Sequence, residues 1–458
     1  MSLFQKKAEK KVEQETYFES SVSTSNPYID ELVEHYKTRL LTETNLEQLT
    51  NLSDGERRLS IERLINQFMS EEKVVIPRHE RDSMLSRLID ESVGFGPLEA
   101  LLKDDDITEI LVNGPKEVFI EKRGQLQKSD VTFKDEEHVR HIIDRVVAPL
   151  GRRIDESSPM VDARLPDGSR VNAVIPPISL NGTLISIRKF RKTPFEMDDL
   201  ISYSTLTEEM SEFLQAIVEA KTNILVSGGT GSGKTTFLNA VAKAIPLRER
   251  VITIEDSAEL RLNRSSVVGM EARPSNVEGK GEISIRQLVK NALRMRPDRI
   301  IVGEVRGAEA FDMLQAMNTG HEGSLTTVHA NTPSDAISRV EGMVVMAGMD
   351  LPTHIIREYI VGALDFIVQV ERLTDGTRKL MNISEVYVDH ESKIQVQDIF
   401  KFQRTGLGEK GEVLGMFTAT GIRPRCLEKL KMYGINLNDD LFEPKEGANV
   451  DHKRIYSV

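Results

Sequence analysis

The chain has 458 residues, of which 39% are hydrophobic and 29% are charged, and its formal net charge is −12. This length exceeds what one hydrophobic core usually organises, and the composition is that of a soluble globular protein, so we expect two or three domains. The acidic excess argues against a broad nucleic-acid-binding surface, and no apolar run approaches the ~18 residues of a membrane span.

Five segments are expected along the chain. Residues 1–29 are rich in Glu, Lys and Ser, which predicts a mobile polar tail. Over residues 30–90 apolar residues recur every three or four positions, which predicts a helical bundle of about three amphipathic helices. Short β-rich pieces between turn residues predict a smaller α/β domain over 91–192. A linker is expected over 193–206, and residues 207–458 are expected to form the nucleotide-binding core.

Two observations favour a cytoplasmic protein. The amino terminus lacks the apolar core of a signal peptide. Cys426 is the only cysteine, so no intrachain disulfide can form. Because no metal-spaced partner accompanies Cys426, we expect it to be a small packing residue near the start of a helix.

A glycine-rich segment carries the strongest functional signal. Residues 228–235 read GGTGSGKT and match the phosphate-loop pattern G-x-x-x-x-G-K-[ST], between a strand-like run and a helix-like run. A loop around a polyphosphate needs inward-facing N–H groups and close backbone approach, both of which glycine permits. Lys234 would reach the β- and γ-phosphates, and Thr235 would ligate Mg²⁺. The expected binding residues are Gly228, Gly229, Thr230, Gly231, Ser232, Gly233, Lys234, Thr235 and Thr236.

Carboxylates end two further predicted strands. The strand VITIE ends in Glu255, followed by Asp256 and Glu259, and the strand RIIVGE ends in Glu304. The carboxyl ends of strands in α/β sheets face the crevice where ligands bind, which is where a magnesium- or water-positioning acid belongs. The aspartate usual before that glutamate is Gly303 here. Glu304 therefore acts alone or shares the task with Glu255 and Asp256.

Two histidines, His321 and His329, lie eight residues apart in the Gly- and Thr-rich segment TGHEGSLTTVHAN. An isolated histidine is often a structural group, so the residues alone leave the role of His321 open.

Four segments in order resemble the type II/type IV secretion ATPase superfamily: GGTGSGKTT as Walker A, ITIEDSAEL as Asp box, RPDRIIVGEVRG as Walker B and TGHEGSLTTVHAN as His box. The flanking segments GRRIDESSPMVDARLPDGSRVNAVIPP and MFTATGIRPRCLEKLKMYGINLNDDLF resemble, more narrowly, the CpaF/TadA family of Tad (Flp) pilus assembly ATPases. The resemblance covers residues from about 90 to 445. It implies an α/β fold, with a RecA-like core, a smaller PAS-like N-terminal α/β domain and an N-terminal helical bundle.

The resemblance also implies a hexameric motor that hydrolyses ATP with Mg²⁺ and drives pilin into or out of a fibre. Such a motor works in the cytoplasm, at the inner membrane, through pilus platform proteins. By resemblance Glu304 would position the attacking water, Glu255 and Glu259 would support the metal site, and His321 and His329 would sense the γ-phosphate.

Two arginines of the smaller domain have matching positions in related ATPases. The resemblance implies that Arg170 and Arg188 reach the triphosphate as arginine fingers, helped by Arg191. Planar guanidinium groups suit phosphate oxygens, and lysine would not replace them.

Three other functions share part of this sequence pattern. A regulatory GTPase needs a guanine-reading NKxD motif, and no Asn in the chain is followed by Lys. A scaffold that binds ATP without hydrolysis is disfavoured because Lys234, Thr235 and Glu304 are all present. A DNA-translocating ATPase of the conjugation type shares all four motifs and stays open. The zinc-binding CxxC pairs of some type II secretion relatives are missing, so no structural metal is expected.

Overall fold

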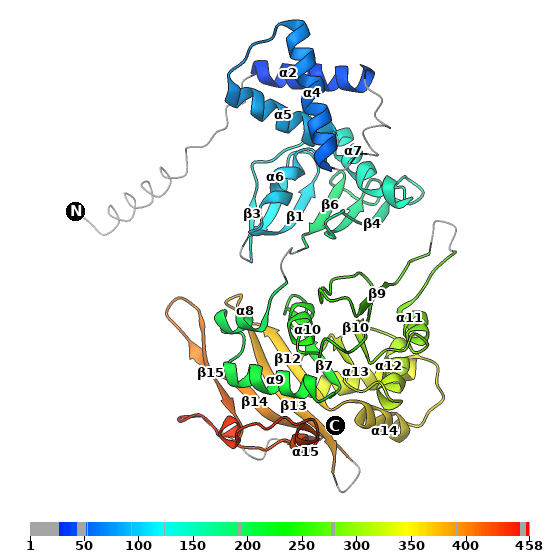
Figure 1. The fold of residues 1–458 in the computed structure, drawn as a ribbon, viewed down its shortest axis with the longest axis vertical. Helices are drawn as coiled ribbons and strands as arrows, with labels where there is room; N and C mark the ends of the chain where they lie inside the picture. Colours follow the sequence, from blue (N-terminus) through cyan, green and yellow to red (C-terminus); the bar gives the residue numbers. More distant parts are fainter. Residues whose placement is uncertain are drawn as a thin grey trace, which may run out of the picture. The chain divides into compact units, whose positions relative to one another are not determined.

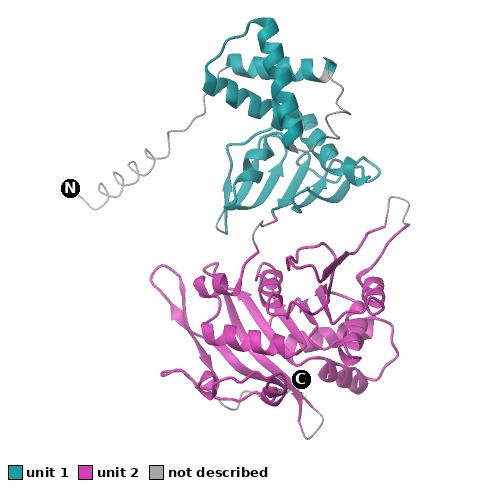
Figure 2. Cartoon of the chain, in the orientation of Figure 1, with its two compact units in different colours: residues 1–189 teal, residues 190–458 magenta. Residues whose placement is uncertain are grey.

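The chain folds into two compact units, residues 1–189 and residues 190–458, in a computed structural model (Figure 2). The structure describes residues 27–43, 52, 54–92, 94–122, 124–190, 194–275, 280–389, 393–448 and 455–457. Most of the segment expected to be a mobile tail lies outside these residues, as does Arg191. Within the described residues, no helix combines the length and apolar character needed to cross a bilayer.

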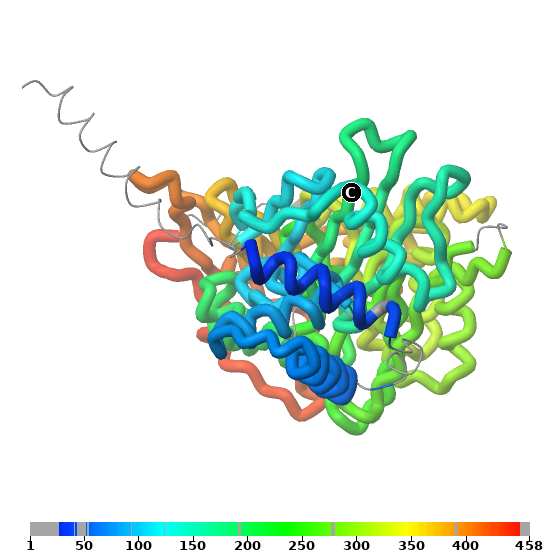
Figure 3. Tube along the Cα trace, turned by 90° about the horizontal axis from the view of Figure 1, so that it is seen from above, coloured from blue at the N-terminus to red at the C-terminus, as the bar shows by residue number. Residues whose placement is uncertain are grey.

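Within the described residues of unit 1, three helices lie where a bundle was expected: α2 (Pro27–Glu43), α4 (Asp54–Glu72) and α5 (Arg78–Ser92). Each of the three contacts the other two (Figure 1 and Figure 3). Residues at helical spacing fill the space between them, because each helix has one apolar face. The most deeply buried of these residues are Tyr36, Leu40, Ile61, Ile65, Met84 and Leu88.

The remainder of unit 1 is an antiparallel sheet of six strands with helices packed on one core. The strand order is β3-β2-β1-β6-β5-β4. The elements are α6 (Leu98–Lys103), β1 (Ile107–Asn113), β2 (Val118–Lys122), β3 (Gln125–Lys128), α7 (Glu136–Val147), η1 (Ala148–Leu150), β4 (Met160–Arg164), β5 (Arg170–Val174) and β6 (Leu184–Arg188). Asp135 caps α7 by accepting a hydrogen bond from the N–H of His138 (2.8 Å).

Unit 2 is built on one large mixed sheet with the order β15-β14-β13-β12-β7-β11-β10-β8-β9, and β16 pairs with β14. The strands are β7 (Ile224–Gly228), β8 (Val251–Glu255), β9 (Val267–Glu271), β10 (Arg299–Val305), β11 (Leu325–Val328), β12 (Phe366–Arg372), β13 (Arg378–Val388), β14 (Ile394–Leu407), β15 (Val413–Ala419) and β16 (Ile455–Ser457). From β12 to β9 all neighbours are parallel, whereas β12 to β15 are antiparallel. The central parallel strands read as continuous apolar runs because both of their faces are buried.

Two separate apolar clusters flank this sheet, one that includes α9 and α10 and one that includes α11 to α14. The helices are α8 (Met197–Ser202), α9 (Glu208–Glu219), α10 (Lys234–Ala242), α11 (Ile285–Ala292), α12 (Glu309–Asn318), α13 (Pro333–Met346), α14 (Thr353–Ala363) and α15 (Leu427–Met432), followed by η2 (Asp439–Phe442). Helix α8 falls inside the stretch expected to be a linker, because Glu196 and Asp199 form a capping box that starts it.

Cys426 precedes α15 and packs against the first of these clusters, so its expected role as a small packing residue is confirmed. Burial raises the pKa of its thiol well above the ordinary value, which keeps the thiol protonated.

Candidate functional site

The parallel strands of unit 2 bring four predicted segments to one edge of the sheet. The phosphate loop follows β7, and the neighbouring strands β11, β10 and β8 end next to His329, Glu304 and Glu255 respectively. Since the carboxyl ends of parallel strands lie on the same side of a sheet, these residues stand at the edge where the loop lies. The strand order thus brings His329 to the same edge as the loop, although about 100 residues separate them in the sequence.

The phosphate loop itself has the backbone that a polyphosphate cradle needs. Gly231 (φ 71°) and Gly233 (φ 91°) adopt left-handed conformations that favour glycine. Helix α10 starts at Lys234, so its amino-terminal N–H groups open into the loop. The Lys234 ammonium donates to the carbonyl oxygens of Gly228 (3.0 Å) and Gly229 (3.1 Å), which holds a cation over the loop.

Two further details agree with an anionic ligand in this loop. The Ser232 hydroxyl is buried without a hydrogen-bond partner in the described structure. Mg²⁺ sites in such loops use few protein ligands because phosphates and waters complete the coordination, and Thr235 at the second position of α10 suits that role. The residues present therefore fit a nucleotide polyphosphate with its magnesium ion.

Glu255 occupies the place left by the missing aspartate. Its Cγ lies 2.9 Å from the position that a Cβ on Gly303 would take, so the glycine makes room for this side chain. Its Oε2 accepts from the backbone N–H groups of Glu259 (2.7 Å) and Leu260 (3.0 Å), which fixes the loop after β8. Glu255 is thus a buried carboxylate beside Walker B, and Glu259 reaches the site through its backbone.

Glu304 is held by an arginine that sequence reasoning did not single out. Its Oε2 accepts from Arg306 Nε (3.0 Å) and Nη2 (2.7 Å), and Arg306 Nη1 lies 3.7 Å from Asp256. The carboxylates raise the pKa of the Arg306 guanidinium, Glu304 foremost. Arg306 therefore competes with water and metal for Glu304, and the two-residue spacing in GEVRG was the available signal.

The two histidines are separated by the structure. His329 follows β11 on the loop side of the sheet, where burial and the positive charge of Lys234 lower its pKa while Glu304 opposes them. His321 precedes β11 at the amino-terminal edge, where its carbonyl oxygen accepts from Ser324 Oγ (2.7 Å). The strand between the edges spans about 13 Å at ~3.3 Å per residue. His329 therefore stands at the edge of the sheet where the phosphate loop lies, and His321 stands at the opposite edge. That these histidines sense the γ-phosphate stays a prediction, and their positions favour His329 for this role.

Unit 1 brings the two expected arginine fingers together. Arg170 opens β5 and Arg188 ends β6, and they are direct partners in the antiparallel register. Arg164 on β4 pairs with Arg170 from the other side. Three arginines thus form a row across neighbouring strands, and Arg164 was missed because cross-strand register cannot be read from one segment.

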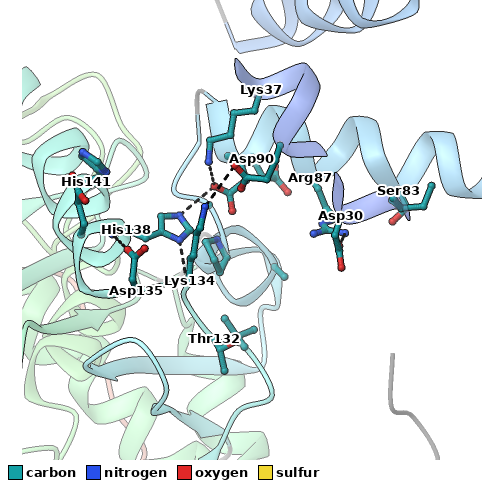
Figure 4. Close-up of a pocket in the computed structure, with 18 of the residues that line it drawn as sticks. Asp30, Lys37, Ser83, Arg87, Asp90, Thr132, Lys134, Asp135, His138 and His141 are labelled. Atoms are coloured by element: carbon teal, nitrogen blue, oxygen red, sulfur yellow. Dashed lines mark hydrogen bonds and ion pairs between the residues drawn. The ribbon is translucent and has the colours of Figure 1, made fainter. Parts of the chain in front are cut away.

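A cavity of about 1160 Å³ lies elsewhere in unit 1, between α2, α5, α7 and the segment before α7 (Figure 4). Glu91 is one of its lining residues; it accepts from Lys37 (3.0 Å) and lies 3.2 Å from His138 Nε2. Burial by itself raises the pKa of Glu91, but the hydrogen bonds from His138 and Lys37 outweigh it and lower the pKa to about 2. The pair with Lys37 joins two helices of the bundle, and the pair with His138 joins the bundle to α7 of the α/β part. We therefore assign these polar residues a structural role.

Comparisons with known proteins show which proteins the chain resembles. The family model described as type II/IV secretion system protein matches residues 91–407. A putative conjugal transfer protein of Mycobacterium tuberculosis (strain CDC 1551 / Oshkosh) is 38% identical over 320 residues, covering 69% of this chain and 90% of the relative. The type IV secretion system protein VirB11 of Brucella suis biovar 1 is 34% identical over 327 residues, covering 65% and 90%. The solved VirB11 ATPase of Brucella suis, in complex with sulphate, has 30% identity and a TM-score of 0.34, covering 63% of this chain and 94% of that one.

Proposed function

The chain belongs to the type II/IV secretion system protein family, and on that premise we propose that it is a hexameric ATPase motor that powers secretion or pilus assembly. One observation carries the proposal: the phosphate loop, Glu255, Glu304 and His329 stand side by side at the carboxyl edge of one parallel sheet. That is the arrangement of a RecA-like core, and unit 1 supplies a PAS-like domain and a helical bundle.

Each residue has a defined task in this proposal. Lys234 holds the β- and γ-phosphate oxygens, and Thr235 ligates Mg²⁺, which neutralises phosphate charge when bound. Glu304 would orient the attacking water once Arg306 releases it, and Glu255 would support the magnesium ion. His329, whose lowered pKa favours the neutral imidazole, would donate a hydrogen bond toward the γ-phosphate.

Arg164, Arg170 and Arg188 are proposed to act on the triphosphate of a neighbouring copy in the ring. Arginine fingers stabilise the charge that develops during phosphoryl transfer and are worth about 10³-fold or more in rate. Mixing Arg188→Ala with Lys234→Ala tests sharing, because one chain can lend its arginines to the other's intact loop. Recovered hydrolysis in mixed rings supports sharing. No recovery, together with turnover per chain that is independent of protein concentration, refutes it.

Two biological roles are open to such a motor, and they differ in the membrane proteins that it binds. The flanking segments resemble Tad (Flp) pilus ATPases, and this resemblance supports the first candidate: a motor that works in the cytoplasm on inner-membrane platform proteins, moves pilin indirectly and binds no nucleic acid. The names of the relatives favour a second candidate, a conjugation-type or type IV secretion ATPase. Co-purification from membranes decides between them. Recovery of pilus platform proteins supports the Tad assignment, and recovery of conjugation proteins replaces it.

A further inference from the structure

A β-hairpin far along the chain lies against the phosphate loop. Arg372 at the end of β12 and Arg378 at the start of β13 are direct partners in the antiparallel register. Arg378 Nε donates to the carbonyl oxygen of Gly231 (3.0 Å), and its Cδ lies 3.3 Å from where a Cβ on Gly233 would stand. Arg372 Nη1 lies 3.8 Å from the corresponding position on Gly231. The hairpin therefore touches the loop at its two left-handed glycines.

The hairpin is itself fixed at several points. Asp375 in its turn accepts from the N–H groups of Val413 (2.7 Å) and Thr377 (2.9 Å). The hydrogen bond from Val413, followed by that from the Thr377 side chain, lowers the pKa of Asp375 to about 2. Lys379 donates to the carbonyl oxygen of Ser204 (2.5 Å). Arg378 thus extends from a hairpin whose position is fixed by these hydrogen bonds.

The hydrogen bond from Arg378 to Gly231 fixes the orientation of one peptide unit of the loop. A peptide unit is planar and trans, so its carbonyl and its N–H point in opposite directions. Arg378 holds the carbonyl of Gly231, and this also orients the N–H of Ser232 in the same peptide unit. Gly231 and Gly233 flank Ser232 and allow the loop many backbone conformations. Fixing the Gly231 carbonyl reduces the number of these conformations.

We propose that Arg378 is a positioning residue that holds the phosphate loop in its nucleotide-binding conformation and so sets the affinity for ATP and ADP. This inference rests on the proposed function, in which the loop binds the nucleotide. A hydrogen bond from a charged donor to a carbonyl is strong enough to change the fraction of loops in the nucleotide-binding conformation about tenfold. When this hydrogen bond is lost, the apparent affinity for nucleotide falls by the same factor.

The experiment measures the Kd of a fluorescent ADP analogue for the full-length parent, Arg378→Ala, Arg378→Gln and Arg372→Ala. Arg404→Ala is the matched control, because Arg404 is an exposed arginine of β14 in the same sheet. We expect about tenfold weaker binding for Arg378→Ala, with an unchanged melting temperature in the absence of nucleotide, and parent-like binding for Arg404→Ala. Arg372→Ala is expected to weaken binding less, since the hydrogen bond that fixes the Gly231 carbonyl comes from Arg378.

Binding by Arg378→Ala within twofold of the parent overturns the proposal. If Arg378→Ala does not fold, Arg378→Gln decides, because it keeps a polar side chain without the charge or the reach: fivefold weaker binding supports the proposal and parent-like binding overturns it. A parent protein that binds no ADP refutes the proposed function instead, so the two failures are distinguishable.

Discussion

Gly228 lies where the structure leaves no room for a side chain. It ends β7 opposite Val370 of β12, and a Cβ added there would lie 2.4 Å from the Val370 carbonyl oxygen and 2.5 Å from Ser232 Oγ. The serine side chain can rotate, but the carbonyl is backbone in a buried strand. Gly228→Ala must therefore push β7 and β12 apart at the mouth of the phosphate loop.

The expected cost follows from the nature of that contact. Overpacking a well-packed interior costs about 1–3 kcal/mol, and a backbone neighbour places this variant at the upper end. For a unit of this size each kcal/mol lowers the melting temperature by about 2–4 °C, so we expect a fall of about 6–12 °C. ADP affinity should weaken at least about tenfold because the loop moves with β7.

Gly229→Ala is the matched control, one residue along the same loop. A Cβ on Gly229 would meet nothing within 4 Å, and its φ lies outside the left-handed region. Thermal unfolding followed by circular dichroism should show this fall for Gly228→Ala and a parent-like melting temperature for Gly229→Ala, and ADP titration checks the weaker binding of Gly228→Ala. Equal melting temperatures for the two alanine variants would refute the packing argument.

Three further predictions concern catalysis and stability. Glu304→Gln should bind ATP normally but hydrolyse it about 10²-fold more slowly in a phosphate-release assay, and a larger loss in Glu255→Gln would reverse our ranking of the carboxylates. His329→Asn should reduce hydrolysis at least about tenfold whereas His321→Asn should stay within threefold of the parent, and the opposite order would contradict the separation of the two edges. Because the pKa of Glu91 is lowered to about 2, its stabilisation is complete above the ordinary pKa of 4.5 and is lost as pH falls toward 2. Glu91→Gln should therefore cost about 2–3 kcal/mol in urea unfolding at pH 7, and a difference from the parent that does not shrink between pH 4.5 and 2 would contradict the assignment.

Local patterns predicted the parts of the site that depend on nearby residues. The glycines of the phosphate loop, the apolar strand before it and the helix after it are contiguous, so the sequence was sufficient for them. Glu255 and Glu304 were found because each ends an apolar strand run. Their order beside the loop could not be read from the chain, because strand order depends on packing between segments far apart in sequence.

Other features were out of reach for identifiable physical reasons. The contact between Gly303 and Glu255 joins neighbouring strands, and the hairpin of Arg378 reaches the loop from 147 residues away. His321 is a different case. The four-residue strand between it and His329 was visible in the sequence, and its length along the sheet already implied that the two histidines stand at opposite edges.

The most direct test of the central claim is the steady-state rate of ATP hydrolysis by the full-length protein with Mg²⁺, beside Lys234→Ala. Lys234 supplies the cation held over the loop carbonyls, so its loss should abolish hydrolysis and weaken ATP binding while leaving the fold intact. The account predicts magnesium-dependent turnover in the parent and none above background in the variant. A parent without turnover at concentrations where rings form, or a variant that hydrolyses ATP as fast as the parent, would contradict it.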